Sequence, residues 1–336
     1  MINLNVFSQI LSLIDRELFK DLVSKHKSAK HQKGINSWTH LVSMLFCHFS
    51  SADSVRDISN GLRSTTGNLN HLGVVRAPSK SNISYINTHR THELFKDLYY
   101  SVLDRLWQKD THFRKDLGQL KRKVYLMDAS IIPLCLSVFD WAKFRSTKGA
   151  VKLHTVLDYD GCLPVFMQIT DGKVHESQRA GSYSFSKGSV VVVDRGYVDY
   201  SWLGDFLVHF WDSTTGNEYH FLTNNTKWKA SLVANIYKER WHIEVFFKHL
   251  KQRLKVSTFI GTSENAVMIQ IWTSLIGILL LKYLQKKAKY DWNLSNLVAF
   301  IRMNIFVKIN IWQWIDDPFL RPPIKGKKGQ LKIFAD

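Results

Sequence analysis

Four side chains that could act on a charged substrate recur along one predicted helix, residues 230–255. No glycine or proline interrupts this stretch, and the four are Tyr237, Arg240, Glu244 and Lys251. At 100° per residue they fall on one narrow stripe. Beside the stripe lies a continuous apolar face, made of Leu232, Ile236, Ile243, Phe247, Leu250 and Leu254. The pattern predicts a helix with Ser231 as candidate N-cap, docked into a core, with these polar groups along the edge of the docked face.

By itself the stripe has a simpler explanation. An amphipathic helix with an Arg240–Glu244 pair at i,i+4 would look the same, and such a pair contributes roughly a few tenths of a kcal/mol. Two aspartates upstream change the interpretation. Asp128 ends the run Lys-Val-Tyr-Leu-Met-Asp, and Asp194 ends Ser-Val-Val-Val-Val-Asp before Arg195-Gly-Tyr. Short apolar runs predict strands, so we expect two strand-end aspartates to accompany a helical glutamate.

This set of residues resembles the DDE transposases of bacterial insertion sequences, in the group whose third motif is a Y-R-E-K signature. The spacing Tyr-x2-Arg-x3-Glu-x6-Lys and the Asp-Arg-Gly-Tyr context carry the resemblance, which covers nearly the whole chain. It implies that Asp128, Asp194 and Glu244 are catalytic and bind metal. Each carboxylate also has a structural alternative, namely a strand end or turn for the aspartates and a surface ion pair for the glutamate.

Phosphodiester cleavage and strand transfer fit three carboxylates. Two divalent ions roughly 3.5–4 Å apart neutralise the phosphate, activate the nucleophile and stabilise the leaving oxygen. Mg²⁺ prefers a few carboxylates with waters and phosphate oxygens. The scattered cysteines offer no softer ligand cluster. We therefore expect Mg²⁺ or Mn²⁺, two ions per active site.

Basic side chains around the predicted site are candidates for contact with DNA. The resemblance implies that Tyr237, Arg240 and Lys251 contact DNA phosphates near the cut. Cationic side chains bind phosphates well, and Arg195 is a further candidate for such a contact. Arg240 could instead only orient Glu244. A second basic group lies between the first two predicted strands, and we expect it beside Asp128 along a DNA backbone, although a solvated surface hairpin is the alternative. Its members are Lys143, Arg145 and Lys148.

Composition narrows the class of partner. The formal net charge of +18 implies a polyanion, nucleic acid first and an anionic membrane second. Hydrophobic content of 45% excludes a disordered protein. Three scattered cysteines argue against disulfides or zinc and fit a reducing cytosol. The apolar run 266–281 contains Gln270 and is bounded by Glu264 and Lys282, so we expect a buried core helix and no membrane association. The expected location is the bacterial cytoplasm, at the nucleoid.

Residues 1–120 read as an all-helical region. A helix that begins near Ser79 or Ser81 would have a polar side able to enter a major groove, made of Ser81, Asn82, Asn87, His89 and Arg90. The alternative is a small bundle whose polar faces are only solvated. The resemblance places DNA binding in this region and favours the first interpretation.

The middle of the chain changes from helical to strand periodicity. Strands are predicted at 123–132, 151–159 and 162–169, with a hairpin turn at Asp160-Gly161, followed by a polar helix and loop over 175–187. The run 189–193 is apolar enough for a central strand covered on both faces. This order suits an α/β RNase H-like core, a mixed sheet with flanking helices, and the resemblance implies that fold. We assign the catalytic domain and C-terminal helices to 121–315 and a basic tail to 316–336.

The interval between the second aspartate and the glutamate departs from the family pattern. Asp194 and Glu244 are 50 positions apart. A short helix at 201–207 and a hairpin turning at 215–217 fill it, whereas the family carries a fifth core strand and a long β insertion. We interpret about 207–224 as a truncated insertion. The resemblance implies a cut-and-paste transposase that acts on terminal inverted repeats and target DNA as a homodimer. The alternative is an internally deleted remnant that binds DNA without cutting.

Overall fold

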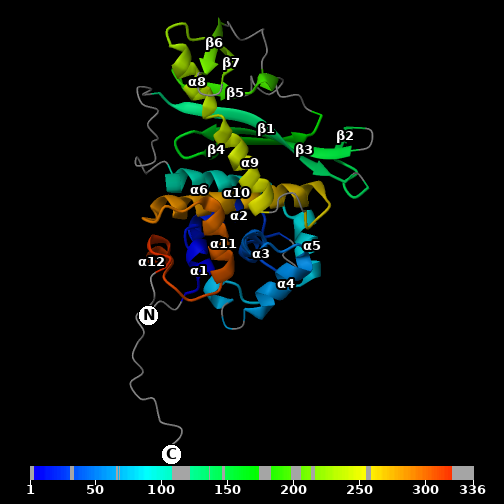
Figure 1. Cartoon of the computed structure of the whole chain (residues 1–336). Helices are drawn as coiled ribbons and strands as arrows, with labels where there is room; N and C mark the ends of the chain where they lie inside the picture. The colour runs from blue at the N-terminus through cyan, green and yellow to red at the C-terminus, as the bar shows by residue number, and fades with distance from the viewer. Residues whose placement is uncertain are drawn as a thin grey trace, which may run out of the picture.

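A layer of helices packs against one face of a mixed sheet (Figure 1). The structure, a computed structural model, describes residues 4–30, 34–65, 67, 69–107, 122–135, 137–145, 148–173, 183–197, 206–212, 216–254 and 259–319. One continuous hydrophobic core contains residues from both layers, from Val6 in the first helix to Ile315 in the last. The sheet and the helical layer therefore share their packing surface.

The N-terminal part is helical, as predicted. Its helices are α1 (Val6–Leu11), α2 (Arg16–Lys25), α3 (Ser37–Ser50), α4 (Val55–Ser64), the 3₁₀ turn Asn70–Leu72, α5 (Lys80–His89) and α6 (Glu93–Trp107). Side-chain caps fix most of their starts, because a side-chain oxygen accepts an otherwise unpaired backbone N–H in the first turn. The capping residues are Asn5, Asp15, Asn36, Ser54 and Ser79.

Helix α10 (Glu264–Lys287) lies at the centre of the helical layer and contacts α3, α5 and α6. It is long and apolar enough to cross a membrane, but 83% of its apolar window is buried within the protein. The expected core helix is thus confirmed. Helices α11 (Leu294–Asn304) and α12 (Ile311–Asp316) complete the layer at the C-terminal side.

The main sheet is built on two long strands, β1 (Val124–Leu134) and β3 (Lys148–Asp158), which pair antiparallel. Strand β4 (Leu163–Asp171) pairs antiparallel with β3, and the short β2 (Lys143–Arg145) pairs with the start of β3. The Asp160-Gly161 turn between β3 and β4 is confirmed. Tyr99 of α6 donates a hydrogen bond from its hydroxyl to Pro164 O of β4 at 2.6 Å, which ties the helical layer to the sheet.

Strand β5 (Val190–Val193) pairs parallel with β1. Both of its faces are covered, as predicted: Val192 belongs to the main core, whereas Val191 and Val193 pack on a second cluster around Met127 and Tyr197. The expected central position is wrong for the described strands, among which β5 lies at the edge of the sheet. Its apolar composition therefore reflects coverage of its faces and not a neighbour on both sides.

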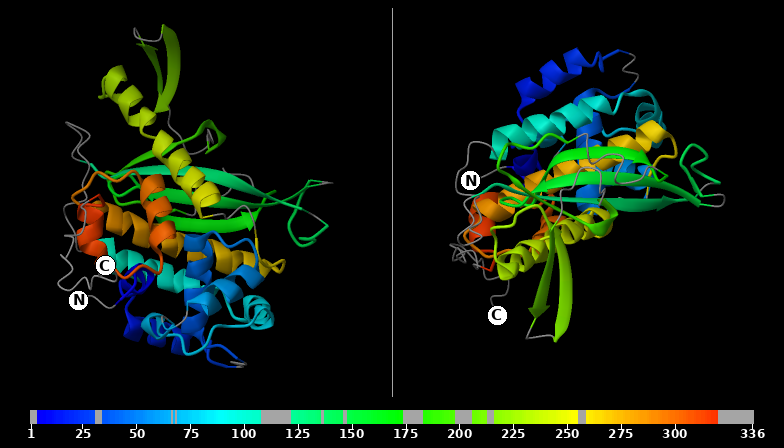
Figure 2. Two further views of the ribbon diagram at one scale, coloured as in Figure 1. Left: turned by 60° about the horizontal axis from the view of Figure 1, so that its bottom comes forward. Right: turned by 90° about the horizontal axis from the view of Figure 1, so that it is seen from above.

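The predicted hairpin after β5 is confirmed as a separate two-stranded sheet of β6 (Phe206–Asp212) and β7 (Asn217–Thr223). It projects away from the rest of the molecule (Figure 2). Most of the predicted helix 201–207 lies outside the described residues. Its last two residues belong to β6, because antiparallel pairing with β7 satisfies their backbone groups. Of the segment predicted as helix and loop, residues 183–187 have no helix, and 174–182 are outside the described part.

Candidate active site

The two predicted aspartates lie at the same level of two neighbouring parallel strands. Met127 of β1 pairs with Val193 of β5, so Asp128 and Asp194 come next on each strand. Neighbouring strands lie about 4.8 Å apart, and side chains at alternate positions share a face. Both aspartates thus lie on the face of Leu126 and Val192, which packs into the main core. Asp194 directly follows β5, as expected for a strand end. Asp128 lies inside β1, which continues six residues beyond it. The predicted strand 123–132 already extends past Asp128, whereas a position at the very end of a strand is wrong for this aspartate.

The glutamate comes from a helix that is broken, contrary to the prediction of one regular helix over 230–255. Helix α8 (Ala230–Lys238) ends in a tight turn, α9 (Trp241–Lys248) follows, and a π-helical turn covers His249–Arg253. The amide of Arg240 donates to Tyr237 O at 3.0 Å, an i→i−3 bond that winds the chain more tightly. Residue 255 lies outside the described part.

Docking of this broken helix follows the predicted apolar pattern. Leu232 is partly buried against the core, and the other predicted apolar positions are buried, namely Ile236, Ile243, Phe247, Leu250 and Leu254. The predicted N-cap Ser231 is wrong. Lys229 occupies the cap position without a side-chain hydrogen bond, and the helix starts at Ala230, two residues earlier than a cap at Ser231 would require. Burial of the apolar face, and not capping, therefore positions the helix.

Arg240 joins the carboxylates from the strand and the helix. Its Nη1 lies 3.2 Å from Asp128 Oδ2, and its Nη2 lies 2.7 Å from Glu244 Oε1. The side chains of Asp128, Arg240 and Glu244 are 15%, 18% and 37% exposed, so this bridge is largely shielded from water. Burial disfavours the charged guanidinium. The negative groups around it, Asp194 included, outweigh that effect and raise the pKa of Arg240.

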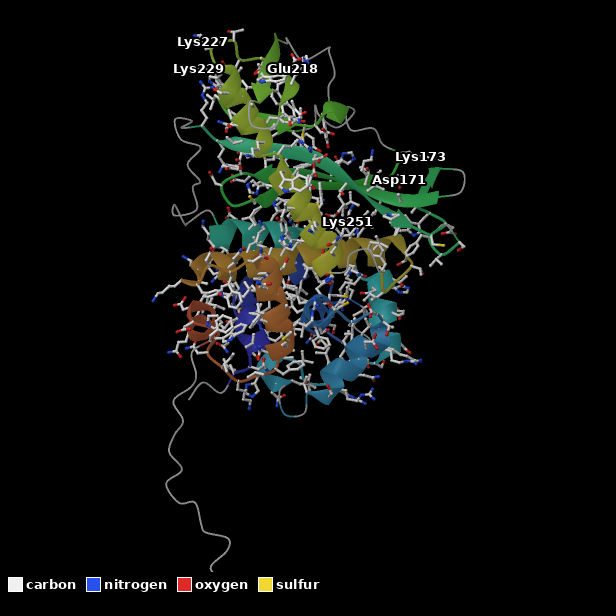
Figure 3. All side chains as sticks on the ribbon, in the orientation of Figure 1. Asp171, Lys173, Glu218, Lys227, Lys229 and Lys251 are labelled. Atoms are coloured by element: carbon white, nitrogen blue, oxygen red, sulfur yellow. The ribbon has the colours of Figure 1, made fainter. Side chains whose placement is uncertain are left out.

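Tyr237 and Lys251 flank this bridge at either end of the broken helix. The Tyr237 ring packs on Phe221 of β7 at 5.0 Å between ring centroids, and Arg240 Cζ lies 5.7 Å from the tyrosine ring. Lys251 donates to Ile131 O of β1 at 2.7 Å, and burial lowers its pKa. Figure 3 places Lys251 between the sheet and the helical layer. Of the predicted stripe, Arg240 and Lys251 thus contact β1, Glu244 is joined to β1 through Arg240, and Tyr237 lies against the β6–β7 hairpin.

The predicted basic group on the sheet lies farther away than expected. Lys143 and Arg145 bound β2, and Lys148 begins β3, whereas Asp128 pairs with Thr155 of β3. Seven residues of strand separate Lys148 from that level, roughly 23 Å at about 3.3 Å per residue. The expected place beside Asp128 is wrong, because β1 and β3 run on as a long ribbon. Arg195 directly follows Asp194 and begins the 3₁₀ turn Arg195–Tyr197.

Sequence reasoning missed a support behind Arg240. Glu239 Oε2 accepts a hydrogen bond from the Tyr159 hydroxyl at 2.8 Å and lies 3.0 Å from His242 Nε2. Tyr159 sits in the β3–β4 turn, so the contact anchors the break between α8 and α9 to the sheet. No short-range signal could have revealed it, because the two residues are 80 positions apart.

The predicted polar side of α5 is only partly exposed. Ser79 caps the helix, which confirms one of the two predicted starts. Asn87 and Arg90 are buried, contrary to expectation: Asn87 Oδ1 lies 2.7 Å from His40 Nε2, and Arg90 donates to backbone carbonyls at residues 35 and 36. Ser81 and His89 remain exposed, and the His89 ring stacks on Tyr85 at 4.1 Å.

The donor chemistry of the site suits a hard divalent cation, since the candidate ligands are carboxylate oxygens. As the described side chains stand, no three His, Cys, Asp or Glu residues surround one point closely enough to hold a metal ion. The positive charge between Asp128 and Glu244 is instead supplied by Arg240.

Comparison with known proteins finds two matching families and several similar proteins. Residues 119–280 match the family described as a transposase DDE domain, and residues 3–75 match a domain of unknown function, DUF4372. A protein of Sinorhizobium fredii described as a transposase, y4zB, is 24% identical over 61% of this chain and 71% of its own length. A transposase for insertion sequence element IS5377 of Geobacillus stearothermophilus is 23% identical over 62% and 70%.

A shorter match is closer in sequence. A protein of Synechocystis described as a transposase for insertion sequence element IS4SA is 35% identical over 26% of both chains. Residues 119–280 are thus similar to a transposase DDE domain, and the three bacterial proteins that share part of the sequence are each described as transposases.

Proposed function

We propose that this chain, with its transposase DDE domain, cuts DNA at the ends of an insertion sequence and transfers the 3′-hydroxyl ends into target DNA. Asp128, Asp194 and Glu244 would be the catalytic carboxylates. The observation that carries the proposal is their convergence: adjacent parallel strands supply two, and one guanidinium links the first to the helical glutamate. Groups whose pKa is shifted by burial and by specific charged neighbours are concentrated at functional sites, and Arg240 among these carboxylates is such a group.

The sheet supports an RNase H-like core. Three antiparallel strands, β4, β3 and β1, continue into the parallel strand β5. A helix that carries the glutamate packs on the same face. We propose that the interval after β5 is a shortened insertion that retains the β6–β7 hairpin, and that the chain belongs to the Y-R-E-K group.

The three carboxylates would hold Mg²⁺ or Mn²⁺, two ions per site. When bound, such ions neutralise the scissile phosphate and activate the attacking oxygen. The residues of this chain contribute the rest. Asp128 is held by its backbone contact, in which Ala129 N–H donates to Oδ1 at 2.7 Å, and the buried face of α9 fixes Glu244 opposite the sheet. Tyr237, Arg240, Lys251 and Arg195 would contact the phosphates on either side of the cut.

Beyond the cut, the chain would hold the terminal repeats and target DNA over a longer basic surface. Lys143, Arg145 and Lys148 would contact the duplex roughly 23 Å from the level of Asp128, which is less than one turn of DNA (about 34 Å). Residues 1–120 would bind the repeat. We expect a homodimer on DNA, in the bacterial cytoplasm at the nucleoid. A remnant that binds without cutting is not favoured, because the candidate carboxylates and their supports are assembled.

Strand nicking tests this proposal. The purified protein would be incubated with the DNA that flanks its reading frame, with Mg²⁺ or Mn²⁺ and with chelator, beside an Asp194→Asn variant. We expect metal-dependent cuts at the repeat ends that the variant does not make. Specific binding without any cut, under conditions where the protein is folded, would contradict the enzyme and favour the remnant.

A further inference from the structure

The guanidinium of Arg240 occupies oxygens that a divalent cation would need. Asp128 Oδ2 and Glu244 Oε1 accept from its two terminal nitrogens, while Asp128 Oδ1 accepts from Ala129 N–H. A planar guanidinium offers forked donors that can bridge two carboxylates. A partly buried cluster of carboxylates repels itself unless a positive charge lies among them, and in this structure Arg240 supplies that charge.

The bridge leaves one donor of the same side chain unsatisfied. Arg240 Nε is buried, and among the described residues no atom accepts its hydrogen. A buried N–H without an acceptor is unfavourable. The bridge therefore neutralises the two carboxylates but leaves one hydrogen-bond donor of the arginine unpaired. The Nε and Nη edge of a guanidinium fits a phosphate with two parallel hydrogen bonds. An alternative position with a phosphate would therefore satisfy the donor that the bridge leaves unpaired.

We propose that Arg240 is an exchangeable counter-ion, which bridges Asp128 and Glu244 before metal binds and releases them when a divalent cation enters. Released from the carboxylates, the side chain is available for a DNA phosphate. Metal loading and phosphate contact are thereby coupled through one residue. This inference rests on the proposed function, because it requires that the carboxylates bind metal.

The exchange predicts that Arg240 competes with metal in the absence of DNA. Mn²⁺ binding would be measured by isothermal titration calorimetry on the DNA-free protein, for the unmodified chain and for Arg240→Gln. Arg56→Gln is the matched control, because it removes the same charge from an exposed position on α4. We expect Arg240→Gln to bind Mn²⁺ at least about tenfold more tightly than the unmodified chain, and Arg56→Gln to bind as the unmodified chain does.

The substitution Asp194→Asn, made alone and together with Arg240→Gln, separates the possible failures. Both variants should bind Mn²⁺ more weakly than the proteins that keep Asp194, which locates the bound ion at this site. Weaker or unchanged binding by Arg240→Gln would overturn the exchange alone and would mean that Arg240 orients the ligands. Absence of Mn²⁺ binding in every variant would overturn the metal-dependent function as well.

A measurement on the unmodified chain removes dependence on the variant's folding. The arginine Nε–H signals of ¹⁵N-labelled protein would be followed during titration with Mg²⁺, with Arg240→Lys used only to assign the resonance. We expect the Arg240 signal to move as metal binds. A signal that stays in place while Mg²⁺ binds would overturn the exchange.

Discussion

Asp128 and Asp194 stand at the same level of two parallel strands, because the residues immediately before them, Met127 and Val193, are register partners. A slip of one residue would turn one aspartate to the opposite face of the sheet, since side chains alternate along a strand. In the observed register Leu126 packs into the main core on the face of the aspartates, and Met127 packs into the second cluster on the opposite face. Core packing thus fixes the relation between the two carboxylates.

Loss of a carboxylate should abolish cutting and preserve DNA binding. Glu244→Gln keeps the shape of the side chain but removes the charge that would hold a metal ion. Even outer partners of metal ligands change activity by roughly 10–100-fold, so loss of a ligand should exceed about 100-fold. Cleavage rates and gel-shift affinities would be measured together. A variant that cuts at more than a tenth of the original rate would exclude Glu244 as a ligand.

The support behind Arg240 can be tested through Tyr159→Phe, which removes the hydroxyl that donates to Glu239. A hydrogen bond to a charged group contributes about 1.5–3 kcal/mol, so we expect a loss of that order in the free energy of unfolding. Urea denaturation measures it, with Tyr85→Phe, an exposed ring on α5, as the control. Equal stability of the two variants would show that the contact does not hold the turn.

Acid should destabilise the protein through His48. This buried imidazole links the broken helix to the core: Nδ1 lies 3.1 Å from Leu254 O and Nε2 lies 3.0 Å from Thr273 Oγ1. Burial lowers its pKa to about 4. Between pH 6.5 and 4 the unfolded chain binds a proton that the folded chain does not, so stability falls as pH falls, by up to about 3 kcal/mol.

The His48→Gln variant isolates this contribution. Its stability at pH 7 should be lower, but it should depend less on pH between 6.5 and 4 than that of the unmodified chain. Thermal unfolding at a series of pH values measures both slopes. Burial lowers the pKa of His40 to about 3. His40 is present in both proteins, so it contributes equally to the pH dependence of stability in each. Parallel slopes would contradict the assignment to His48.

Lys251 should contribute one phosphate contact. Each neutralised phosphate adds about 0.9 to the slope of log affinity against log salt. Lys251→Gln should therefore reduce that slope by about one and weaken binding to all sequences alike. Lys20→Gln, in which the lost cation pairs with Glu17 on exposed α2, is the control. An unchanged slope would mean that Lys251 contacts no phosphate.

Much of the scaffold could be predicted because local patterns and global packing agree. The apolar face of the glutamate helix, the Asp160-Gly161 turn and the core helix α10 all follow from periodicity and turn chemistry, and the structure confirms them. The two aspartates could be picked out because each ends or interrupts an apolar run. That they share one sheet level requires the register, which a single strand does not encode.

The features that could not be predicted depend on contacts between residues that are far apart in the sequence. The break at Arg240 arises where bonds to Asp128 and the support of Tyr159 meet, neither of which is local. Asn87 and Arg90 were expected to face solvent, but His40 and the carbonyls at 35 and 36 satisfy them within the core. Polar side chains on a helix indicate an exposed face only when the core offers them no hydrogen-bond partner.

The central claim is that these carboxylates hold the metal ions that cut DNA, and a change of ligand tests it most directly. Asp194→Cys replaces a hard oxygen with a soft sulfur, which Mg²⁺ binds poorly and Mn²⁺ tolerates better. We expect the variant to be inactive in Mg²⁺ and to regain cleavage in Mn²⁺, while Asp194→Ser stays inactive in both. Equal cleavage by Asp194→Cys in the two metals, or no recovery beyond that of Asp194→Ser, would contradict a role of Asp194 as metal ligand.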